Sequence, residues 1–221
     1  MLILFELSPN CNKMLIHALN IGQKKLVEWR GKKIYTGIFK SPVTHPIILG
    51  FNDVVGDDVV DRKYHGGIDK ACYAYSKEAY GFWQKKYPAH TLENGFFGEN
   101  ITIEGLDESK MKIGDRFEIG TAIIEVSQPR QPCFKLGIRF GSQKILKPFI
   151  QAPYPGAYFR VIQSGTIHMG HQFKLIQSFE SEPTLLEVYQ VIYHTTTSAA
   201  LQKKVLQSKY LAQSAKDSIK I

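Results

Sequence analysis

The sequence predicts a mainly β fold, a barrel of antiparallel strands with flanking helices and a small three-helix appendage at the C-terminal end. The first observation is a series of short alternating runs separated by glycine-containing turns, as in repeated β-hairpins. Such hairpins are typical of a closed or nearly closed barrel. The second observation is a change after Glu182, where apolar residues begin to recur at helical spacing. We therefore expect a barrel domain over residues 14–179 and a helical domain over residues 180–221.

Three hairpins account for most of the expected barrel strands. Their strands cover residues 25–29 with 34–39, 113–119 with 123–126, and 157–163 with 172–177. The turns contain Gly31, Gly120 and Gly165, as tight turns often do. Residues 1–13 show neither a strand nor a helix period, and Met14 offers an alternative start. They are interpreted as an N-terminal extension of unknown role, and whether they are native is open.

Helices are expected to be few before residue 180 and to dominate after it. The expected helices cover residues 76–87, 142–147, 184–192, 199–206 and 211–219. Ser76 can cap the first of them, and Pro148 is expected to cut or kink the second. Thr184 and Glu187 form a capping-box pattern before an apolar helical face. The last three helices are expected to form a unit that docks on the barrel.

Composition indicates an ordinary globular protein. Hydrophobic residues make up 43% of the 221 residues and charged residues 22%, which argues against disorder and against a membrane span. The apolar start from Met1 to Leu7 has no basic residue before it and is too short for a secretory signal, so a cytoplasmic location is expected. The net charge of +8 favours an anionic partner, either nucleic acid or a phosphorylated small molecule.

Cys133 follows directly after the second hairpin, in the stretch SQPRQPCFK, whose two prolines restrict the backbone around it. Three cysteines without CxxC spacing favour free thiols over disulfides or a zinc finger. Arg130 and Lys135 lie close in sequence and favour the thiolate, which is both a nucleophile and a ligand for soft metals. A buried structural cysteine is the competing interpretation, and for Cys72 it is the preferred one.

Two glycine-containing stretches carry further candidates. In DRKYHGGIDK the backbone can approach an anion while neighbouring side chains add positive charge. The candidates there are Arg62, Lys63, His65, Gly66 and Gly67. In FFGEN the amide of Asn100 can both donate to and accept from a heteroaromatic ring. An ordinary surface turn explains each stretch equally well when it is taken alone.

Several enzyme classes lack their signatures in this sequence. It contains no GxSxG, HExxH, P-loop or GxGxxG pattern, which argues against the corresponding hydrolases, metalloproteases, nucleotide kinases and Rossmann enzymes. His168 and His171 stand three residues apart, but the sequence offers no further ligands for a zinc site beside them. They are interpreted as loop residues.

Taken together and in order, four stretches and the terminal helical unit resemble MOSC-domain proteins of the YiiM type. The stretches are DRKYHGGIDKACYAYSKEAYGFW, FGENITIEGL, IGDRFEIGTAIIEVSQPRQPCFKL and PGAYFRVIQSGTI. The resemblance extends over nearly the whole chain from about Ile16, and motifs in register are more specific than any one alone. It implies a β-barrel with flanking helices, followed by a three-helix C-terminal domain.

For the site, the resemblance implies binding of molybdenum cofactor, in which the dithiolene of a phosphorylated pterin (molybdopterin) holds the metal. The family's cysteine ligand to the metal corresponds to Cys133. His65 is implied as a second catalytic residue that donates a proton to leaving hydroxide. The residues implied in cofactor binding are Arg62, Lys63, Gly66, Gly67, Asn100, Arg130 and Arg160.

The activity that the resemblance implies is reduction of N-hydroxylated small molecules, notably N-hydroxylated purine bases, for detoxification. The sequence has no flavin, haem or iron–sulfur motif, so the electrons are expected from a separate donor of unknown identity. No membrane partner is expected. The oligomeric state is open, with a homodimer as one option.

Two other functions stay open on the sequence. Cys133 can instead carry a persulfide in sulfur transfer, a role associated with other relatives of the domain. A basic barrel with a lysine-rich helical tail can also bind nucleic acid without catalysis. The chain lacks the aromatic strand motif of RNA-recognition domains, which makes nucleic acid the weaker expectation.

Overall fold

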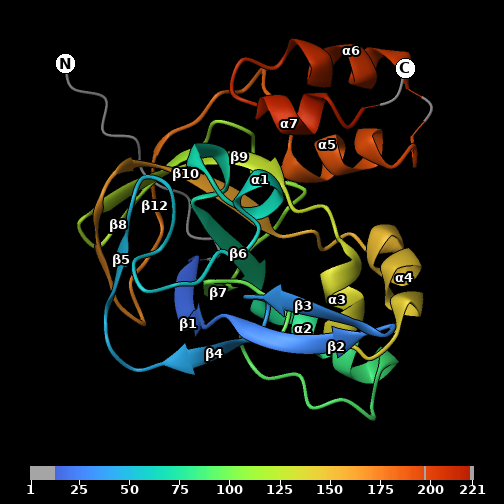
Figure 1. Ribbon diagram of the computed structural model, residues 1–221. Coiled ribbons are helices and arrows are strands. Elements are labelled where there is room, and N and C mark those ends of the chain that lie inside the picture. The colour runs from blue at the N-terminus through green and yellow to red at the C-terminus, as the bar shows by residue number, and fades with distance from the viewer. Residues whose placement is uncertain (1–12, 197, 220–221) are drawn as a thin grey trace, which may run out of the picture.

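The computed structural model describes residues 13–196 and 198–219, and all but the last residue of the extension expected at 1–13 lies outside this range. Figure 1 shows a strongly curled sheet with helices around it. The sheet has the strand order β12-β8-β9-β10-β6-β7-β1-β4, and its one parallel pair is β6 with β7. The prediction of a mainly β fold with flanking helices is confirmed.

The main sheet consists of short strands whose side chains alternate between its two faces. These are β1 (Leu15–Gly22), β4 (Lys40–Val43), β6 (Cys72–Ser76), β7 (Ile101–Glu104), β8 (Arg116–Ile119), β9 (Ala122–Pro129), β10 (Ala157–Gln163) and β12 (Lys174–Gln177). Two smaller sheets pair β2 (Lys25–Trp29) with β3 (Lys32–Thr36), and β5 (Ile47–Leu49) with β11 (Gly165–Ile167).

Backbone hydrogen bonds bring the curled sheet back onto itself. The amide of Ile16 in β1 donates to the carbonyl of His171 at 2.9 Å, and the amide of Phe173 donates to the carbonyl of Met14 at 2.9 Å. Unpaired N–H and C=O groups at the edge of a sheet tend to pair with other chains. These hydrogen bonds satisfy such groups and so stabilise the closure of the sheet. It makes the sheet a nearly closed barrel.

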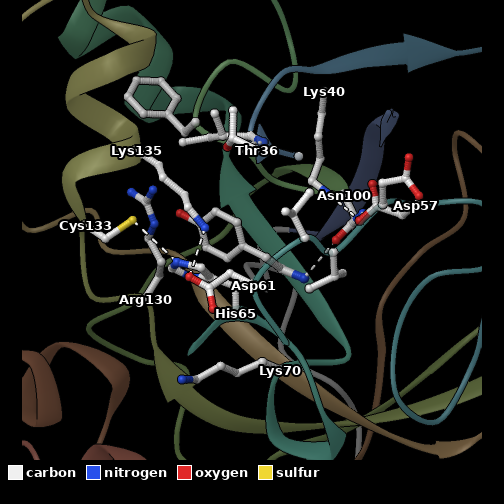
Figure 2. Close-up of a pocket in the computed structure, with 18 of the residues that line it drawn as sticks. Thr36, Lys40, Asp57, Asp61, His65, Lys70, Asn100, Arg130, Cys133 and Lys135 are labelled. Atoms are coloured by element: carbon white, nitrogen blue, oxygen red, sulfur yellow. Dashed lines mark hydrogen bonds and ion pairs between the residues drawn. The ribbon is translucent and has the colours of Figure 1, made fainter. Parts of the chain in front are cut away.

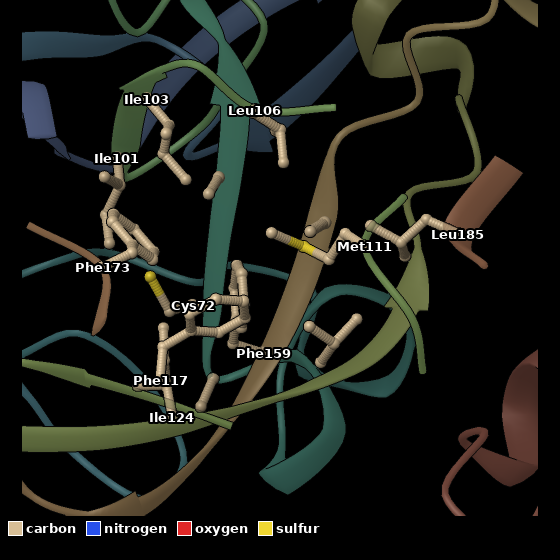
Figure 3. Close-up of a cluster of buried hydrophobic side chains, with 14 of the residues drawn as sticks. Cys72, Ile101, Ile103, Leu106, Met111, Phe117, Ile124, Phe159, Phe173 and Leu185 are labelled. Atoms are coloured by element: carbon tan, nitrogen blue, oxygen red, sulfur yellow. The ribbon is translucent and has the colours of Figure 1, made fainter. Parts of the chain in front are cut away.

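The barrel interior is filled by side chains from the inward face of each strand. Figure 3 shows Cys72, Phe117, Phe159 and Phe173 within this cluster. The rings of Phe117 and Phe173 lie with centroids 5.8 Å apart in an edge-on arrangement, which aromatic pairs prefer. Burial raises the pKa of the Cys72 thiol to about 12, so it stays protonated and unreactive. The prediction that Cys72 is an inward strand residue is confirmed.

Helices cover the ends and one side of the barrel. They are α1 (Arg62–His65), α2 (Lys77–Lys86), α3 (Phe134–Arg139), α4 (Leu146–Gln151), α5 (Leu185–Ile192), α6 (Ala199–Gln207) and α7 (Gln213–Lys216), with 3-10 turns η1 (Ile68–Lys70) and η2 (Gln143–Ile145). Ser76 caps α2, because its hydroxyl accepts from the amide of Ala79. Thr184 and Glu187 form the expected capping box of α5. Both predicted caps are confirmed.

The C-terminal helices share the hydrophobic core of the barrel. Leu185 and Val188 of α5 are fully buried, and they belong to the same apolar cluster as Phe159 of β10. Val205 of α6 and Ala215 of α7 complete that cluster from the outside. A helix gains most of its stability from such packing rather than from intrinsic propensity. The helical unit therefore depends on the barrel face that it covers (Figure 1).

The third expected hairpin, residues 157–163 with 172–177, is wrong. β10 lies between β9 and β6 in the sheet, whereas β12 pairs with β8. After β10 the chain turns away, because the hydroxyl of Ser164 donates to the carbonyl of Leu49 and β11 pairs with β5. A turn signal in the sequence marks a change of direction, but it does not show which strand becomes the neighbour.

Two helix predictions need correction. Pro148 neither ends nor interrupts a helix, because it stands in the first turn of α4, where the missing amide has no intrahelical acceptor to lose. The segment expected as a helix over 211–219 forms only the short α7, Gln213–Lys216. Short apolar segments carry too little periodicity to fix helix length.

The core packing gives a first prediction for two residues of β10. Phe159 is fully buried, and Phe159→Ala is expected to lower the free energy of unfolding by about 3–5 kcal/mol, because it removes buried apolar area and leaves a cavity. Ile162 on the same strand is 41% exposed, and Ile162→Ala is expected to cost less than about 1 kcal/mol. Urea unfolding of both variants checks this. Equal losses would contradict the assignment of the core.

Candidate functional site

A cavity of about 80 Å³ opens where several loops meet at one side of the barrel. Its walls come from the end of β3, the loop at residues 57–61, the region from α1 to β6, the segment before β7, and the chain from β9 to α3. Figure 2 shows Cys133, Arg130, Lys135, Asp61 and His65 on one side of it, and Lys40, Asp57 and Asn100 on the other. The two walls differ in chemistry and are described in turn.

The first wall brings a thiol and an imidazole together. Cys133 lies four residues after the end of β9, at the N-cap position of α3 and in an extended conformation, and His65 is the last residue of α1. The Sγ atom of Cys133 lies 3.6 Å from Nε2 of His65. The ion pair of Lys135 with Asp61, at 3.3 Å, links α3 to the start of α1. This link holds the two helices, and hence the two side chains, in place.

Arg130 supplies a buried positive charge to the same wall. It is only 5% exposed, and its guanidinium lies over the ring of Phe149 at 5.0 Å and that of Tyr73 at 5.5 Å. Within the described part of the chain, its Nη1 atom has no hydrogen-bond partner. A buried N–H without an acceptor costs free energy, and a charged one costs more. The observation points to an anionic ligand in the cavity.

His65 is neutral at physiological pH in this surrounding. Its pKa falls to about 4, first because the ring is buried and then because Lys135, Arg130 and Lys70 repel a further positive charge; Asp61 opposes the shift. A neutral imidazole can still donate from one nitrogen and accept at the other. The ring is therefore available as a hydrogen-bonding group beside Cys133.

The second wall is built around the carboxylate of Asp57. It forms a buried ion pair with Lys40, accepts from the amide of Gly22 at 2.7 Å, and accepts from Nδ2 of Asn100 at 3.0 Å. The Oδ1 atom of Asn100 accepts from the amide of Tyr73 at 3.3 Å. Because the Asn100 amide already holds these partners, it braces the wall rather than offering a free donor–acceptor edge.

The structure brings some of the sequence candidates together and leaves others outside. Four of them line the cavity: Cys133, His65, Asn100 and Arg130. The remaining candidates, Arg62, Lys63, Gly66, Gly67 and Arg160, are not among the lining residues. Arg62 pairs with Asp53 near the surface, and Arg160 pairs with Asp69 and Glu125. Gly67 serves the turn, since its φ of 91° suits a glycine.

Several lining residues were not predicted as site residues from the sequence, although Lys135 was identified as a basic neighbour of Cys133. They are Lys40, Asp57, Asp61, Lys70 and Lys135. Lys135, Asp61 and Lys70 stand inside the two motifs that were singled out, so their proximity to Cys133 and His65 was a usable signal. Lys40 and Asp57 carry no local pattern, and only the fold places them at the cavity.

A metal in this cavity would need ligands from outside the protein. In residues 13–196 and 198–219 no group of three His, Cys, Asp or Glu side chains has the arrangement of a metal site. Cys133 can provide one soft ligand, which suits a metal that brings most of its donors in a bound cofactor. The unpartnered Nη1 of Arg130 suits an anionic part of that cofactor. The residues present therefore fit molybdenum cofactor.

The fold and the cavity together define a class of protein: a β-barrel with a cavity at one side, which is lined by a cysteine and by buried basic side chains. The family described as "MOSC domain" matches residues 61–174, and the chain belongs to that family. YflK of Bacillus subtilis (strain 168) is 36% identical over 89% of each chain, and YiiM of Escherichia coli (strain K12) is 31% identical over 81% of this chain and 80% of its own. The resemblance to YiiM-type MOSC proteins is confirmed.

A solved structure agrees with these relatives. YiiM from Geobacillus stearothermophilus superposes with a TM-score of 0.77 at 32% identity, over 93% of this chain and 96% of that one. A protein of Gibberella moniliformis (strain M3125 / FGSC 7600) named "Reductase" is 29% identical over 80% of this chain, which spans 32% of that protein. In the described residues, no helix is long and apolar enough to cross a membrane.

The lowered pKa of His65 predicts a pH dependence of stability. The folded state holds this proton with a pKa of about 4, and the unfolded chain with one near 6.5, so the unfolded state binds more protons between these values. Stability is therefore complete above about pH 6.5 and falls as the pH drops toward 4, by on the order of 3 kcal/mol. Urea unfolding at several pH values should show this slope, and His65→Gln should flatten it. A variant that keeps the wild-type slope would contradict the assignment.

Arg130 gives a prediction for anion binding. At a phosphate concentration ten times Kd, the wild type is expected to gain about 1.4 kcal/mol of unfolding free energy. Arg130→Gln is expected to lose this gain, because it removes the buried N–H donor that has no partner. Arg62→Gln, on an exposed arginine outside the cavity, is the matched control and should keep it. Thermal unfolding with and without inorganic phosphate makes the comparison, and an equal gain in both variants would refute the site.

Proposed function

We propose that this protein binds molybdenum cofactor at the cavity and reduces N-hydroxylated small molecules such as N-hydroxylated purine bases. One observation carries the proposal: Cys133 and the buried Arg130 line the same cavity, and Nη1 of Arg130 has no hydrogen-bond partner among the described residues. Membership of the MOSC family, whose name refers to the C-terminal domain of molybdenum-cofactor sulfurase, supports it. So does the relative named "Reductase".

Different residues of the first wall would bind different parts of such a cofactor. Cys133 supplies the protein ligand to the metal, and Arg130, with Lys135 and Lys70, holds the anionic groups. The cavity of about 80 Å³ is open to solvent on one side, so a bound cofactor would not need to be fully enclosed. When bound, the cofactor supplies a metal centre that accepts oxygen and exchanges two electrons.

The protons of the reaction must come through the protein's own groups or water. Reduction of R–NHOH to R–NH2 consumes two electrons and two protons and releases water. His65 borders the cavity beside Cys133 and is neutral, so it would relay a proton: one ring nitrogen takes a proton from solvent while the other gives its N–H proton to the leaving hydroxyl. This proton allows the hydroxyl group of the substrate to leave as water rather than as hydroxide.

The electrons are proposed to come from a separate donor. The described residues contain no protein-ligand cluster for a metal redox centre of their own, and the sequence has no flavin or haem motif. The proposed role is detoxification in the cytoplasm. In the relative named "Reductase" the matching region is 32% of the protein, so most of that chain lies outside the match.

Cys133→Ala tests the cofactor assignment. Wild type, purified without oxygen from a host that makes the cofactor, is expected to contain molybdenum and pterin, and Cys133→Ala is expected to lose the metal because its protein ligand is gone. Elemental analysis and the fluorescence of the oxidised pterin measure the two separately. Activity on an N-hydroxylated purine, with reduced methyl viologen as electron donor, should be lost in parallel.

Cys72→Ala is the matched control, since it removes the other described cysteine. It should keep the metal, while lowering stability by about 1 kcal/mol because a small void forms in the core. Wild type without metal or pterin would refute the proposal. Cyanide-labile sulfur on metal-free wild type, absent from Cys133→Ala, would instead favour sulfur transfer, which the thiol–imidazole contact of 3.6 Å also suits.

A further inference from the structure

We propose that the hairpin of β2 and β3 is the docking surface for an acidic electron-carrier protein. This inference rests on the proposed function, because it concerns the source of the two electrons. The reduced carrier loses them, and R–NHOH takes them up with two protons to give R–NH2 and water. The structure supports the surface through its charge, its place beside the cavity and its exposed apolar pair.

The hairpin concentrates positive charge. Residues 24–36 contain five basic side chains and one acidic side chain, a net charge of +4 in a chain whose total is +8. The basic residues are Lys24, Lys25, Arg30, Lys32 and Lys33, and all five are exposed. Charge gathered on one small exposed element steers an oppositely charged partner toward it and speeds association.

The base of the hairpin is anchored beside the cavity. β2 and β3 pair with each other and with no other strand in the described chain (Figure 1). The amide of Lys24 at its base donates to Asp58 at 2.7 Å. Just after β3, a Cβ atom on Gly37 would lie 1.9 Å from the carbonyl oxygen of Asp58, so the chain packs closely there.

These base contacts place the hairpin directly beside the site. Thr36, Gly37 and Ile38 line the cavity together with Asp57 and Asp58. A protein that docks on the hairpin would therefore have its surface next to the cavity that holds Cys133. Close approach of donor and acceptor is what electron transfer between two proteins requires.

The outer face of the hairpin has the composition of a small protein interface. Leu26 and Tyr35 are directly opposite each other across the two strands, and they are 46% and 50% exposed. Because side chains alternate along a strand, Lys33 and Glu28 share this face, and Lys24 lies over Tyr35, so the exposed apolar pair has a charged rim. Weak electron-transfer complexes have small interfaces, in which charge complementarity contributes most to encounter.

The same face is poorly suited to nucleic acid. Binding of single strands relies on bases that stack on open aromatic faces. Here the Nζ atom of Lys24 lies 4.4 Å from the ring centre of Tyr35, so it covers one face of the exposed ring on which a base would stack. The observations therefore favour an acidic protein.

A binding experiment tests the surface without the cofactor. The probe is an acidic FMN-containing flavodoxin, titrated by calorimetry at low ionic strength against cofactor-free wild type and against K24Q/K32Q/K33Q. The triple variant is expected to raise Kd about tenfold, and added salt should weaken wild-type binding. The matched control K174Q/K203Q/K209Q loses the same charge from exposed lysines outside the hairpin and should change Kd less than about twofold.

Turnover by the loaded protein separates this inference from the proposed function. With reduced flavodoxin the triple variant should be slower, while with reduced methyl viologen, which needs no docking surface, it should match wild type. Equal Kd values for the two triple variants, or equal losses with both donors, would overturn the docking surface. Tighter binding of a 20-nucleotide DNA strand than of flavodoxin would also overturn it. No turnover with methyl viologen in wild type would refute the proposed function instead.

Discussion

The site depends on a positive charge that the fold buries without giving it a carboxylate. Arg130 stands three residues before Cys133 and is almost fully buried, between the rings of Tyr73 and Phe149. Contact with aromatic faces offsets part of the cost of removing a guanidinium from water. Within the described residues it forms no ion pair, and Nη1 keeps no acceptor. Burial opposes the charge of Arg130, whereas Tyr73 and Cys133 raise its pKa, and a bound anion would balance the charge further.

On the opposite wall of the cavity the charges are balanced within the protein. Lys40 and Asp57 neutralise each other, and Asn100 and the amide of Gly22 satisfy the remaining acceptor capacity of Asp57. The cavity is therefore asymmetric, with its excess positive charge on the side of Cys133. Such asymmetry orients a ligand, because its anionic end is stabilised only toward Arg130 and Lys135.

Local patterns in the sequence predicted the parts of this protein that local interactions form. The hairpin around Gly120, the cap at Ser76 and the capping box at Thr184 each depend on a few neighbouring residues. Cys133 and His65 were identified as candidates, but their contact across 68 positions is a product of the barrel. Arg130 and Arg160 show most clearly what local sequence patterns could not predict. Arg160 forms ion pairs with Asp69 and Glu125, which are distant in sequence, whereas Arg130 has no carboxylate partner among the described residues. Nothing near either arginine in the sequence distinguishes them.

Occupancy of the cavity and stability of the fold are coupled through this unpaired charge. The free energy spent on burying Arg130 is recovered when an anion binds, and a ligand at a hundred times its Kd adds about 2.7 kcal/mol to the free energy of unfolding. A gain of this size is comparable to the loss from many large-to-small core substitutions. Replacing Arg130 by a neutral side chain would relieve the empty protein and weaken the loaded one. If the proposed anion binds there, the feature that destabilises the empty protein is the one that stabilises the loaded protein.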